Sequence, residues 1–452
     1  MSVKPEQEKH FLDIASSVSG KAWCARDVSD RTVSALVQRF ELPELVARVL
    51  AGRGVGMEDA EAFLSPTLKA FMGPPSDFRD LEKGAARLAA AITAGEGIAI
   101  IGDYDVDGAT SSALLLRFIR ACGHDALVHI PDRLKEGYGP SFEAIENLAS
   151  QGAQVLITVD CGISAHDQLN RAAELGLDVV ILDHHQASEN LPTAVAVVNP
   201  NRQDDVSGQG HLAAVGVAFL MVATVQRDLR IAGWFTAERK APDLLSWLDL
   251  VALGTVCDMV PLTGLNRAFV SQGLKVMATR ANVGLAKLSD VARINRKPDA
   301  FSLSFTLGPR INAAGRLGRS ALGMKLLTTS QPGEAAEIAH SLERLNGERQ
   351  AIEIRIVDEA VEQAEKALGK EGNLPVIVAS GENWHPGVLG LVASRLKERF
   401  SRPAIAIGYG ADQPEASGSG RSIPGVNLGT AIRIAAEKGI LIKGGGHAMA
   451  AG

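Results

Sequence analysis

Cysteine and aromatic residues are scarce in this sequence. Its 452 residues include four cysteines, Cys24, Cys122, Cys161 and Cys257. No CxxC pair occurs among them, which argues against a zinc ribbon or a disulfide framework and favours a reducing cytoplasm. Aromatic residues make up 4% of the chain, so any core must consist mainly of Ala, Val, Leu and Ile.

Long apolar runs and a strong net charge are also lacking. The longest uncharged apolar stretch, residues 213–225, is shorter than the ~18 residues typical of a membrane span, so we expect a buried helix there. The first ten residues, MSVKPEQEKH, have no apolar core of a signal peptide. The net charge of −6 argues against coating nucleic acid by bulk charge and leaves local basic grooves open. We expect a cytoplasmic protein with no membrane partner.

The pattern along the chain predicts an α/β fold with several domains. Residues 1–75 carry short helical patterns without recognisable chemistry. From Gly97 onward, short apolar runs alternate with helical segments, which indicates βαβ units and a parallel sheet covered on both faces. Strands are expected at residues 97–103, 126–131, 154–160 and 178–183. Helices dominate from His211 to about Thr329, which gives a catalytic domain over residues 76–330.

A long uninterrupted helical pattern follows this domain. Residues 331–370 contain no internal proline, and their apolar positions keep no clean heptad, so a connecting helix is favoured over a coiled coil. Beyond it, the expected strands at residues 375–380 and 403–408 enclose a helix at residues 390–400. Residues 371–452 should therefore form a second, smaller α/β domain.

Carboxylates and imidazoles gather at the ends of four of these elements. In a parallel sheet, ligands bind outside the carboxyl ends of the strands, so these side chains should meet at one rim. Leaving so many carboxylates together without a counter-charge is costly, and divalent cations are the usual remedy. The residues are Asp103, Asp105, Asp107, Asp160, Asp183, His184, His185 and Asp258.

Each motif taken alone has a plainer interpretation. DYDVDG matches the start of a calcium loop, but position 12 would be Leu114 and not glutamate. A single aspartate at a strand end is usually a helix cap. The joint occurrence in four elements favours a metal site, and histidine favours Mn²⁺, with Mg²⁺ second. Because eight ligands exceed what one ion needs, two divalent cations and phosphoester hydrolysis are predicted.

These residues resemble a known family. DYDVDGATSSALL, ITVDCGI, LDHH and LGTVCDMVPL resemble, in order, the four motifs of the DHH phosphoesterase superfamily. Further segments resemble the RecJ-type exonucleases specific for single-stranded DNA: RLKEGYGP, LGPRINAAGRL, GENWHPGVLGLVASRLKERF, SGSGRSIPG and GGGHAMAAG. The resemblance runs from about residue 70 to the last residue. It implies a DHH catalytic domain joined by the long helix to a DHH-associated, substrate-binding domain.

The resemblance also implies roles for the clustered residues. Asp160 would bridge the two ions, and Asp103 and Asp183 would be accessory ligands or would orient the ligands. His185 would act near the scissile phosphate, so that Asp160, Asp183 and His185 form the catalytic group. The implied metal ligands are Asp105, Asp107, Asp160, His184 and Asp258.

Local cations suggest where a nucleic acid would bind. Arg133 lies beside flexible glycines, and Arg310 and Arg316 flank Asn312 in what we expect to be a loop of small residues. Glycine-rich loops that let backbone N–H groups approach an anion are expected around Ser419 and Arg421 and again around Gly446 and His447. The plainer alternatives are solvated arginines and ordinary turns.

By resemblance, single-stranded DNA would thread between the two domains in a channel too narrow for a duplex. The 5′ end would meet Arg133, Ser419 and Arg421. Tyr138 and Trp384 would be either stacking or packing residues. His385 would contact the nucleotide.

The resulting prediction is a metal-dependent 5′→3′ exonuclease that releases 5′-mononucleotides in DNA repair and recombination. A helicase and a single-strand-binding protein are further partners that such an enzyme would have. The alternatives are a DHH phosphodiesterase acting on short oligoribonucleotides or cyclic dinucleotides, and a non-catalytic replication scaffold. Members of the family usually continue past the GGGH segment into an oligonucleotide-binding fold, so we expect a chain that is truncated or unusually short.

Overall fold

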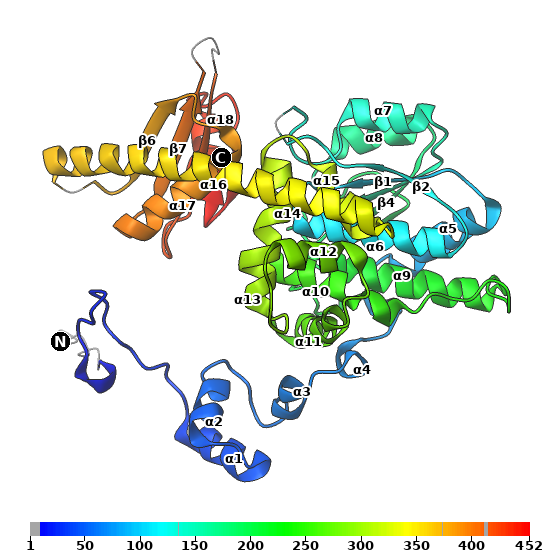
Figure 1. Cartoon of the computed structure of the whole chain (residues 1–452), viewed down its shortest axis with the longest axis horizontal. Coiled ribbons are helices and arrows are strands. Elements are labelled where there is room, and N and C mark those ends of the chain that lie inside the picture. Colours follow the sequence, from blue (N-terminus) through cyan, green and yellow to red (C-terminus); the bar gives the residue numbers. More distant parts are fainter. Residues whose placement is uncertain (1–9, 134, 373, 411–414) are drawn as a thin grey trace. The chain divides into compact units, whose positions relative to one another are not determined.

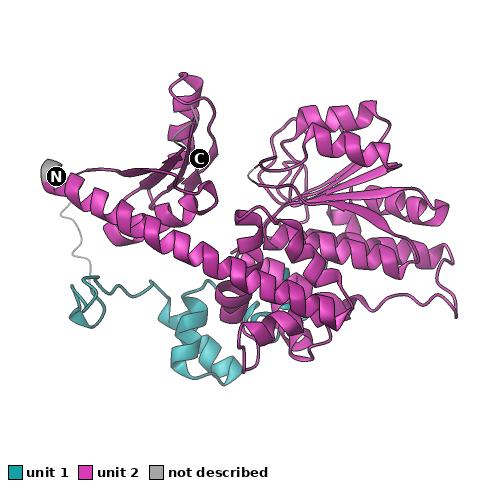
Figure 2. Ribbon diagram, turned by 45° about the horizontal axis from the view of Figure 1, so that its top comes forward, with its two compact units in different colours: residues 1–72, 263–268 teal, residues 73–262, 269–452 magenta. Residues whose placement is uncertain are grey.

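The computed structural model describes residues 10–133, 135–372, 374–410 and 415–452. Those parts of the predicted segments that fall on residues 1–9, Leu134, Asn373 and residues 411–414 lie outside the described residues. Figure 2 shows the chain divided into two compact units, one of residues 1–72 with 263–268 and one of residues 73–262 with 269–452.

The smaller unit is helical, as its sequence pattern predicted. Its core is a small apolar cluster that includes Val33, Leu36, Ala47 and Leu50. Its elements are η1 (Phe11–Asp13), α1 (Asp30–Phe40), α2 (Glu44–Ala51), α3 (Ala60–Leu64) and α4 (Leu68–Phe71).

The larger unit contains a five-stranded parallel sheet in the order β2-β1-β3-β4-β5. The four strands predicted from the sequence are confirmed, and β5 is an additional edge strand that its short apolar run did not reveal. The strands are β1 (Ile98–Gly102), β2 (Ala126–His129), β3 (Val155–Val159), β4 (Asp178–Leu182) and β5 (Ala196–Val198). β1 and β3 are buried along their whole length, which explains their near-continuous Ile, Val and Leu runs.

Helices cover both faces of this sheet (Figure 1). One face carries α7 (Phe142–Ser150) and α8 (His166–Glu174), whose apolar sides join the strands in one core cluster. The other face carries α5 (Leu81–Ala94), α6 (Val106–Ala121) and α9 (Ala214–Ile231). The helix predicted in the longest apolar stretch is confirmed as the largely buried α9. Among the described residues, no helix has the length and apolarity needed to cross a bilayer.

The predicted run of helices after His211 is confirmed. It continues beyond α9 with η3 (Leu244–Trp247), α10 (Leu248–Cys257), α11 (Gly264–Ala278), α12 (Val283–Val291), α13 (Ala300–Ser302), the π-turn η4 (Leu303–Leu307), α14 (Gly308–Arg316) and α15 (Ala321–Thr328). A short 3₁₀ turn, η2 (Pro75–Asp77), precedes α5. The expectation that Arg310, Asn312 and Arg316 lie in a loop is wrong, because they are part of α14. Small residues permit this helix to pack closely: a Cβ on Gly315 would lie 2.7 Å from the Tyr104 carbonyl oxygen.

The predicted long helix is confirmed as α16 (Pro332–Glu371), a continuous helix of 40 residues that begins with a proline. It leads to a second sheet in the order β6-β7-β8-β10-β9. Its elements are β6 (Ile377–Glu382), η5 (Pro386–Val388), α17 (Leu389–Phe400), β7 (Ala404–Tyr409), β8 (Ala416–Arg421), α18 (Leu428–Glu437), β9 (Gly446–His447) and β10 (Ala450–Ala451).

The expected glycine loops in this second domain are wrong in detail. Ser419 and Arg421 belong to β8, which pairs antiparallel with β7, and Gly446 and His447 form the short strand β9. Glycine suits these strands because neighbouring groups come very close. A Cβ on Gly420 would lie 2.6 Å from the Leu428 side chain.

The order of the first sheet determines where a ligand can bind. The chain moves from β1 to the neighbour β2 on one side, and then returns to place β3 on the other side of β1. This reversal makes the carboxyl ends of β1 and β3 a topological switch point, the usual place for a ligand crevice in such sheets.

Candidate metal centre and active site

Two aspartates stand side by side at the switch point. β1 and β3 are in register up to Gly102 and Val159, so Asp103 and Asp160 are the next residues on neighbouring strands. Asp160 has φ of 60°, an uncommon left-handed conformation for a residue other than glycine. Such backbone conformations often occur at functional sites, where the surrounding structure holds them in place.

The first turn of α6 contributes two further carboxylates. Asp105 caps the helix, since its Oδ1 accepts the N–H of Gly108 at 3.1 Å. Asp107 is 1% exposed, and its two oxygens accept the N–H groups of Ala214 and Val215 at the start of α9, at 2.6 and 3.0 Å. The N-termini of two helices therefore favour negative charge at this point.

His184 lies between the carboxylates of two elements. Its Nε2 is 3.3 Å from Oδ1 of Asp160 and 3.6 Å from Oδ2 of Asp258, the residue that follows α10. In three groups of three residues, the potential ligand atoms lie within 4.8 Å of one another. These groups are Asp103, Asp105 and Asp160; Asp107, His184 and Asp258; and Asp160, His184 and His185.

Burial and mutual repulsion hold protons on this cluster. Burial, followed by the charge of neighbouring aspartates, raises the pKa of Asp107 to about 7 and that of Asp258 to about 9. The same causes raise the pKa values of Asp103 and Asp160 well above their usual range. Burial also lowers the pKa of His184 to about 4, so this imidazole is neutral and free to act as a ligand.

The donor atoms fit a divalent metal site. Among the described residues, the buried atoms Asp103 Oδ1, His184 Nε2 and Asp258 Oδ2 have no hydrogen-bond partner. Buried polar atoms without a hydrogen-bond partner are costly, and divalent cations bound in the cluster would satisfy them. Carboxylate oxygens with one neutral imidazole suit manganese or magnesium.

Asp183 has a different surrounding from the other carboxylates. It is fully buried, and its oxygens accept the backbone N–H groups of Ile163, His184 and His185 at 3.0, 2.7 and 3.1 Å. Its Oδ1 also accepts Nδ1–H of His185 at 2.7 Å. Burial acts to raise the pKa of Asp183, but these hydrogen bonds and the charge of His185 outweigh it and lower the pKa.

The hydrogen bond to Asp183 fixes the orientation of the His185 imidazole. Burial acts to lower the pKa of His185, but the bond to Asp183 outweighs it, so the pKa is raised. Since Nδ1 is occupied by Asp183, Nε2 of His185 is the nitrogen available to a substrate. Asp183 is therefore placed to orient His185 and to hold the loop that carries both histidines.

Two asparagines that the sequence reasoning missed support the same loop. Asn199 donates to the carbonyl of His185 at 2.9 Å, and Asn201 donates to that of His184 at 2.5 Å. Both follow β5, the strand that was not predicted. Recognising that strand would have placed its terminal asparagines at the rim.

Aromatic residues and Arg133 surround the open side of the cluster. Tyr138 donates its hydroxyl to the Asp160 carbonyl at 2.8 Å, and burial raises its pKa. Tyr104, which was not singled out from the sequence, meets Tyr138 edge to face at 6.5 Å. The Arg133 guanidinium lies over the Tyr104 ring at 5.2 Å. A cavity of about 360 Å³ is lined by Asp103, Tyr104, Asp105, Arg133, Tyr138, Cys257, Asn312 and Arg316.

Three arginines near this cavity, Arg133, Arg316 and Arg421, lie close enough to one another for their charges to interact. Burial, followed by the charges of Arg133, Arg349 and Arg421, lowers the pKa of Arg316 to about 10. Burial and Arg133 also lower the pKa of Arg421. Arg421 is held by Ser419 Oγ at 3.2 Å, and Arg316 donates to the Gly387 carbonyl at 2.9 Å. Mutual repulsion among these cations favours a bound anion such as phosphate.

Of the remaining residues predicted to bind substrate, His447 lies near the catalytic residues, whereas Arg310 and His385 make structural contacts. His447 lines a cavity of about 260 Å³ together with Asp183 and His185, whereas Gly446 precedes it in β9. Arg310 is paired with Glu343 on α16. His385 Nδ1 accepts the N–H of Gly387 at 3.1 Å and so caps the turn η5.

For Trp384, the structure supports packing and not stacking. The residue is 3% exposed and donates its indole N–H to Glu359 at 2.7 Å. Gly381 and Gly408 make room for it, because a Cβ on either would lie within 2.4 Å of Trp384 atoms.

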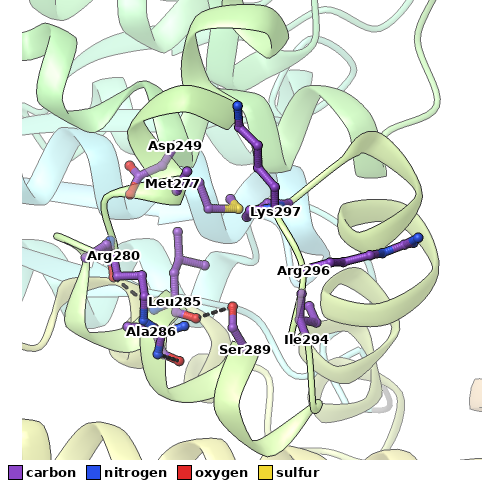
Figure 3. A pocket seen from close by; sticks show the side chains of 12 residues that line it. Asp249, Met277, Arg280, Leu285, Ala286, Ser289, Ile294, Arg296 and Lys297 are labelled. Atoms are coloured by element: carbon purple, nitrogen blue, oxygen red, sulfur yellow. Dashed lines mark hydrogen bonds between the residues drawn. The ribbon is translucent and has the colours of Figure 1, made fainter.

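A separate cavity of about 360 Å³ lies among α10, α11 and α12 (Figure 3). It contains the buried Asp249 but none of the predicted site residues. Two of its cations are already paired, Arg280 with Asp290 at 2.6 Å and Arg296 with Asp299 at 3.3 Å. This cavity therefore lacks the charge imbalance of the metal cluster.

Family comparisons agree with the arrangement of the two domains. Residues 97–255 match the DHH family, N-terminal domain, and residues 373–452 match the DHHA1 domain. The chain is 40% identical over 419 residues to the single-stranded-DNA-specific exonuclease RecJ of Escherichia coli (strain K12). This similarity covers 91% of the chain and 72% of that relative.

Solved structures are similar over most of the chain. RecJ in complex with Mn²⁺ from Thermus thermophilus has a TM-score of 0.79 and 30% identity, and covers 94% of this chain. The chain spans 58% of that protein. The structure of exonuclease RecJ bound to manganese has a TM-score of 0.70 and 34% identity, over 83% of this chain and 89% of that one.

Replacing Asp160 with asparagine tests the metal site through stability. Without metal at neutral pH, Asp160→Asn should melt at the same temperature as the unsubstituted protein or higher, because a repelled buried carboxylate is removed. Adding Mn²⁺ should raise the melting temperature of the unsubstituted protein clearly more than that of the variant.

The matched control is Asp59→Asn, which neutralises an exposed carboxylate in the smaller unit. It should leave the Mn²⁺-induced shift unchanged. Equal shifts in all three proteins, measured by thermal denaturation with Mn²⁺ and with chelator, would exclude Asp160 as a ligand.

Proposed function

Because the chain belongs to the RecJ family of single-stranded-DNA-specific exonucleases, we propose that it hydrolyses single-stranded DNA from the 5′ end to 5′-mononucleotides. The observation that carries this proposal is the group of buried carboxylates and a neutral imidazole at the switch point of the sheet, beside a cluster of arginines. Its biological setting would be DNA repair and recombination.

The metal ligands would be Asp105, Asp107, Asp160, His184 and Asp258, with Asp103 as an accessory ligand. The approach of Asp160 to His184, together with its place beside Asp103, supports a bridging role. When bound, two Mn²⁺ or Mg²⁺ ions would stabilise the attacking and leaving oxygens of the phosphoryl displacement. The three unpartnered buried atoms support this ligand set.

His185 would form a hydrogen bond with the scissile phosphate. Asp183 fixes the proton on Nδ1 and leaves Nε2 to donate a hydrogen bond to a phosphate oxygen when the ring is charged. The Tyr138 hydroxyl, 3.3 Å from His185 Nδ1, restricts the same ring from another side. The chain's contribution here is orientation and charge stabilisation.

The cations near the cluster would bind the 5′ end of the strand. Arg133 and Arg316 line the cavity beside Asp103 and Asp105, and Arg421 lies close enough to Arg133 for their charges to interact. Guanidinium groups bind phosphate through paired hydrogen bonds, so this cluster favours a strand with a terminal phosphate. Asn312 and Ser419 would add neutral donors.

The cellular setting is also a proposal. The described cysteines are free thiols, which fits the reducing cytoplasm. A helicase that separates strands and a protein that coats single strands would supply the substrate.

A comparison of substrates tests the proposed activity. The protein should degrade 5′-labelled single-stranded DNA with Mn²⁺, release labelled mononucleotide first, and lose activity with chelator. Duplex DNA and a cyclic dinucleotide should react far more slowly. Faster hydrolysis of the cyclic dinucleotide would favour the alternative phosphodiesterase and contradict the proposal.

The 5′-end assignment can be tested at Arg421. Arg421→Ala should reduce the preference for 5′-phosphate over 5′-hydroxyl ends by about tenfold, since one charge-assisted contact is lost. The control is Arg433→Ala, because this exposed arginine on α18 pairs with Glu437. An unchanged preference in Arg421→Ala, measured as the ratio of initial rates on the two ends, would show that the arginine does not read the terminal phosphate.

A further inference from the structure

Three large apolar side chains on α13, η4 and the residue after Asp258 are exposed to solvent. Met259, which directly follows Asp258, is 73% exposed, and Phe301 and Phe305 are 59% and 63% exposed. The two phenylalanine rings lie 4.9 Å apart with 31° between their planes. Ser304, which lies between the two phenylalanines in the sequence, has its Oγ 3.5 Å from the Met259 sulfur. We call Met259, Phe301 and Phe305 together the aromatic platform.

A π-turn interrupts the helical segment that carries these two rings. Residues 300–316 form one helical segment that contains the π-turn η4, in which the Gly308 N–H bonds to the carbonyl of Leu303, five residues earlier. Pro309 follows directly and has no N–H to give to the carbonyl of Phe305. π-turns inside helices are frequently found at functional sites.

A groove continues from the platform to the metal cluster. Phe305 lines a cavity of about 540 Å³, a size within the roughly 300–1,000 Å³ of ligand sites. The cavity also contains Asn312 and Arg316, and both residues line the cavity at the metal cluster as well. The two cavities are therefore neighbours that share one wall of α14.

The walls of this groove combine apolar and cationic side chains. Ile354 on α16 is 62% exposed and faces the same cavity as Phe305. The lining residues include four arginines, Arg310, Arg316, Arg349 and Arg395, and one carboxylate, Glu353. Ion pairs with Glu343 and Glu353 hold Arg310 and Arg349 in place. Each guanidinium has five N–H donors, so donors remain for phosphate.

We propose that the aromatic platform and this groove bind the single strand on the 3′ side of the scissile phosphate, with bases stacked on Phe301 and Phe305. The inference rests on the proposed function. From Phe305 to Arg316, 11 residues of helix span about 16 Å, the length of several nucleotide units. Stacking on aromatic rings tolerates any base, as a nuclease without sequence preference needs.

The occupant is nucleic acid and not a protein because the platform is continuous with the metal cluster and the groove is rich in arginine. A surface for a protein partner would need no connection to the cavity that holds Asp103 and Asp105. Binding along this track would make the enzyme's affinity depend on strand length.

The test compares long and short substrates in the Phe301→Ala, Phe305→Ala double variant. For an oligonucleotide of about 20 residues, KM should rise about tenfold to 100-fold. Hydrolysis of a dinucleotide, which is too short to reach the platform, should stay within about twofold of the unsubstituted protein. Phe11→Ala is the matched control, since Phe11 is 49% exposed in the smaller unit.

Two outcomes would overturn the platform. One is an unchanged KM for the long strand, and the other is an equal loss on both substrates, which would mean that the rings support the metal cluster. Photo-crosslinking from 5-iodouracil placed near the 5′ end gives a second readout, with Phe301 or Phe305 as the expected site. An unsubstituted protein that leaves single-stranded DNA intact would instead refute the proposed function.

Discussion

Repulsion among buried carboxylates is the constraint around which the active region is arranged. Asp103 and Asp160 are neighbours because β1 and β3 are, and two helix N-termini bring Asp105 and Asp107 to the same point. Burial and mutual charge raise the pKa values of Asp103, Asp107, Asp160 and Asp258. The site is therefore stable only with protons or cations in it. A metal site follows from this balance.

The carboxylates of this region differ in whether hydrogen-bond donors neutralise their charge. The metal-facing aspartates repel one another, whereas Asp183 is satisfied by three backbone N–H groups and His185. This difference gives the two histidines different states: His184 is neutral and suited to a metal, and His185 is more readily charged and suited to a phosphate. Neighbouring residues in LDHH can thus have opposite roles.

The sequence predicted the parallel sheet, the long helix and the clustered ligands well, because each rests on a local pattern. Buried strands read as continuous apolar runs, and ligands follow at their ends. It was wrong about Arg316 and Ser419, since glycine-rich segments that pack closely in a helix or strand look like loops. It also missed Asn199, Tyr104 and the Phe301–Phe305 pair, whose importance depends on contacts between distant segments.

The central claim is that these carboxylates and His184 hold divalent cations. Anomalous diffraction from crystals grown with Mn²⁺ tests it most directly. The account predicts two peaks within the cluster, bridged by Asp160, with His184 and Asp258 as ligands of the ion on the α10 side. Well-ordered crystals soaked in Mn²⁺ that show no anomalous peak among Asp103, Asp160 and Asp258 would contradict it.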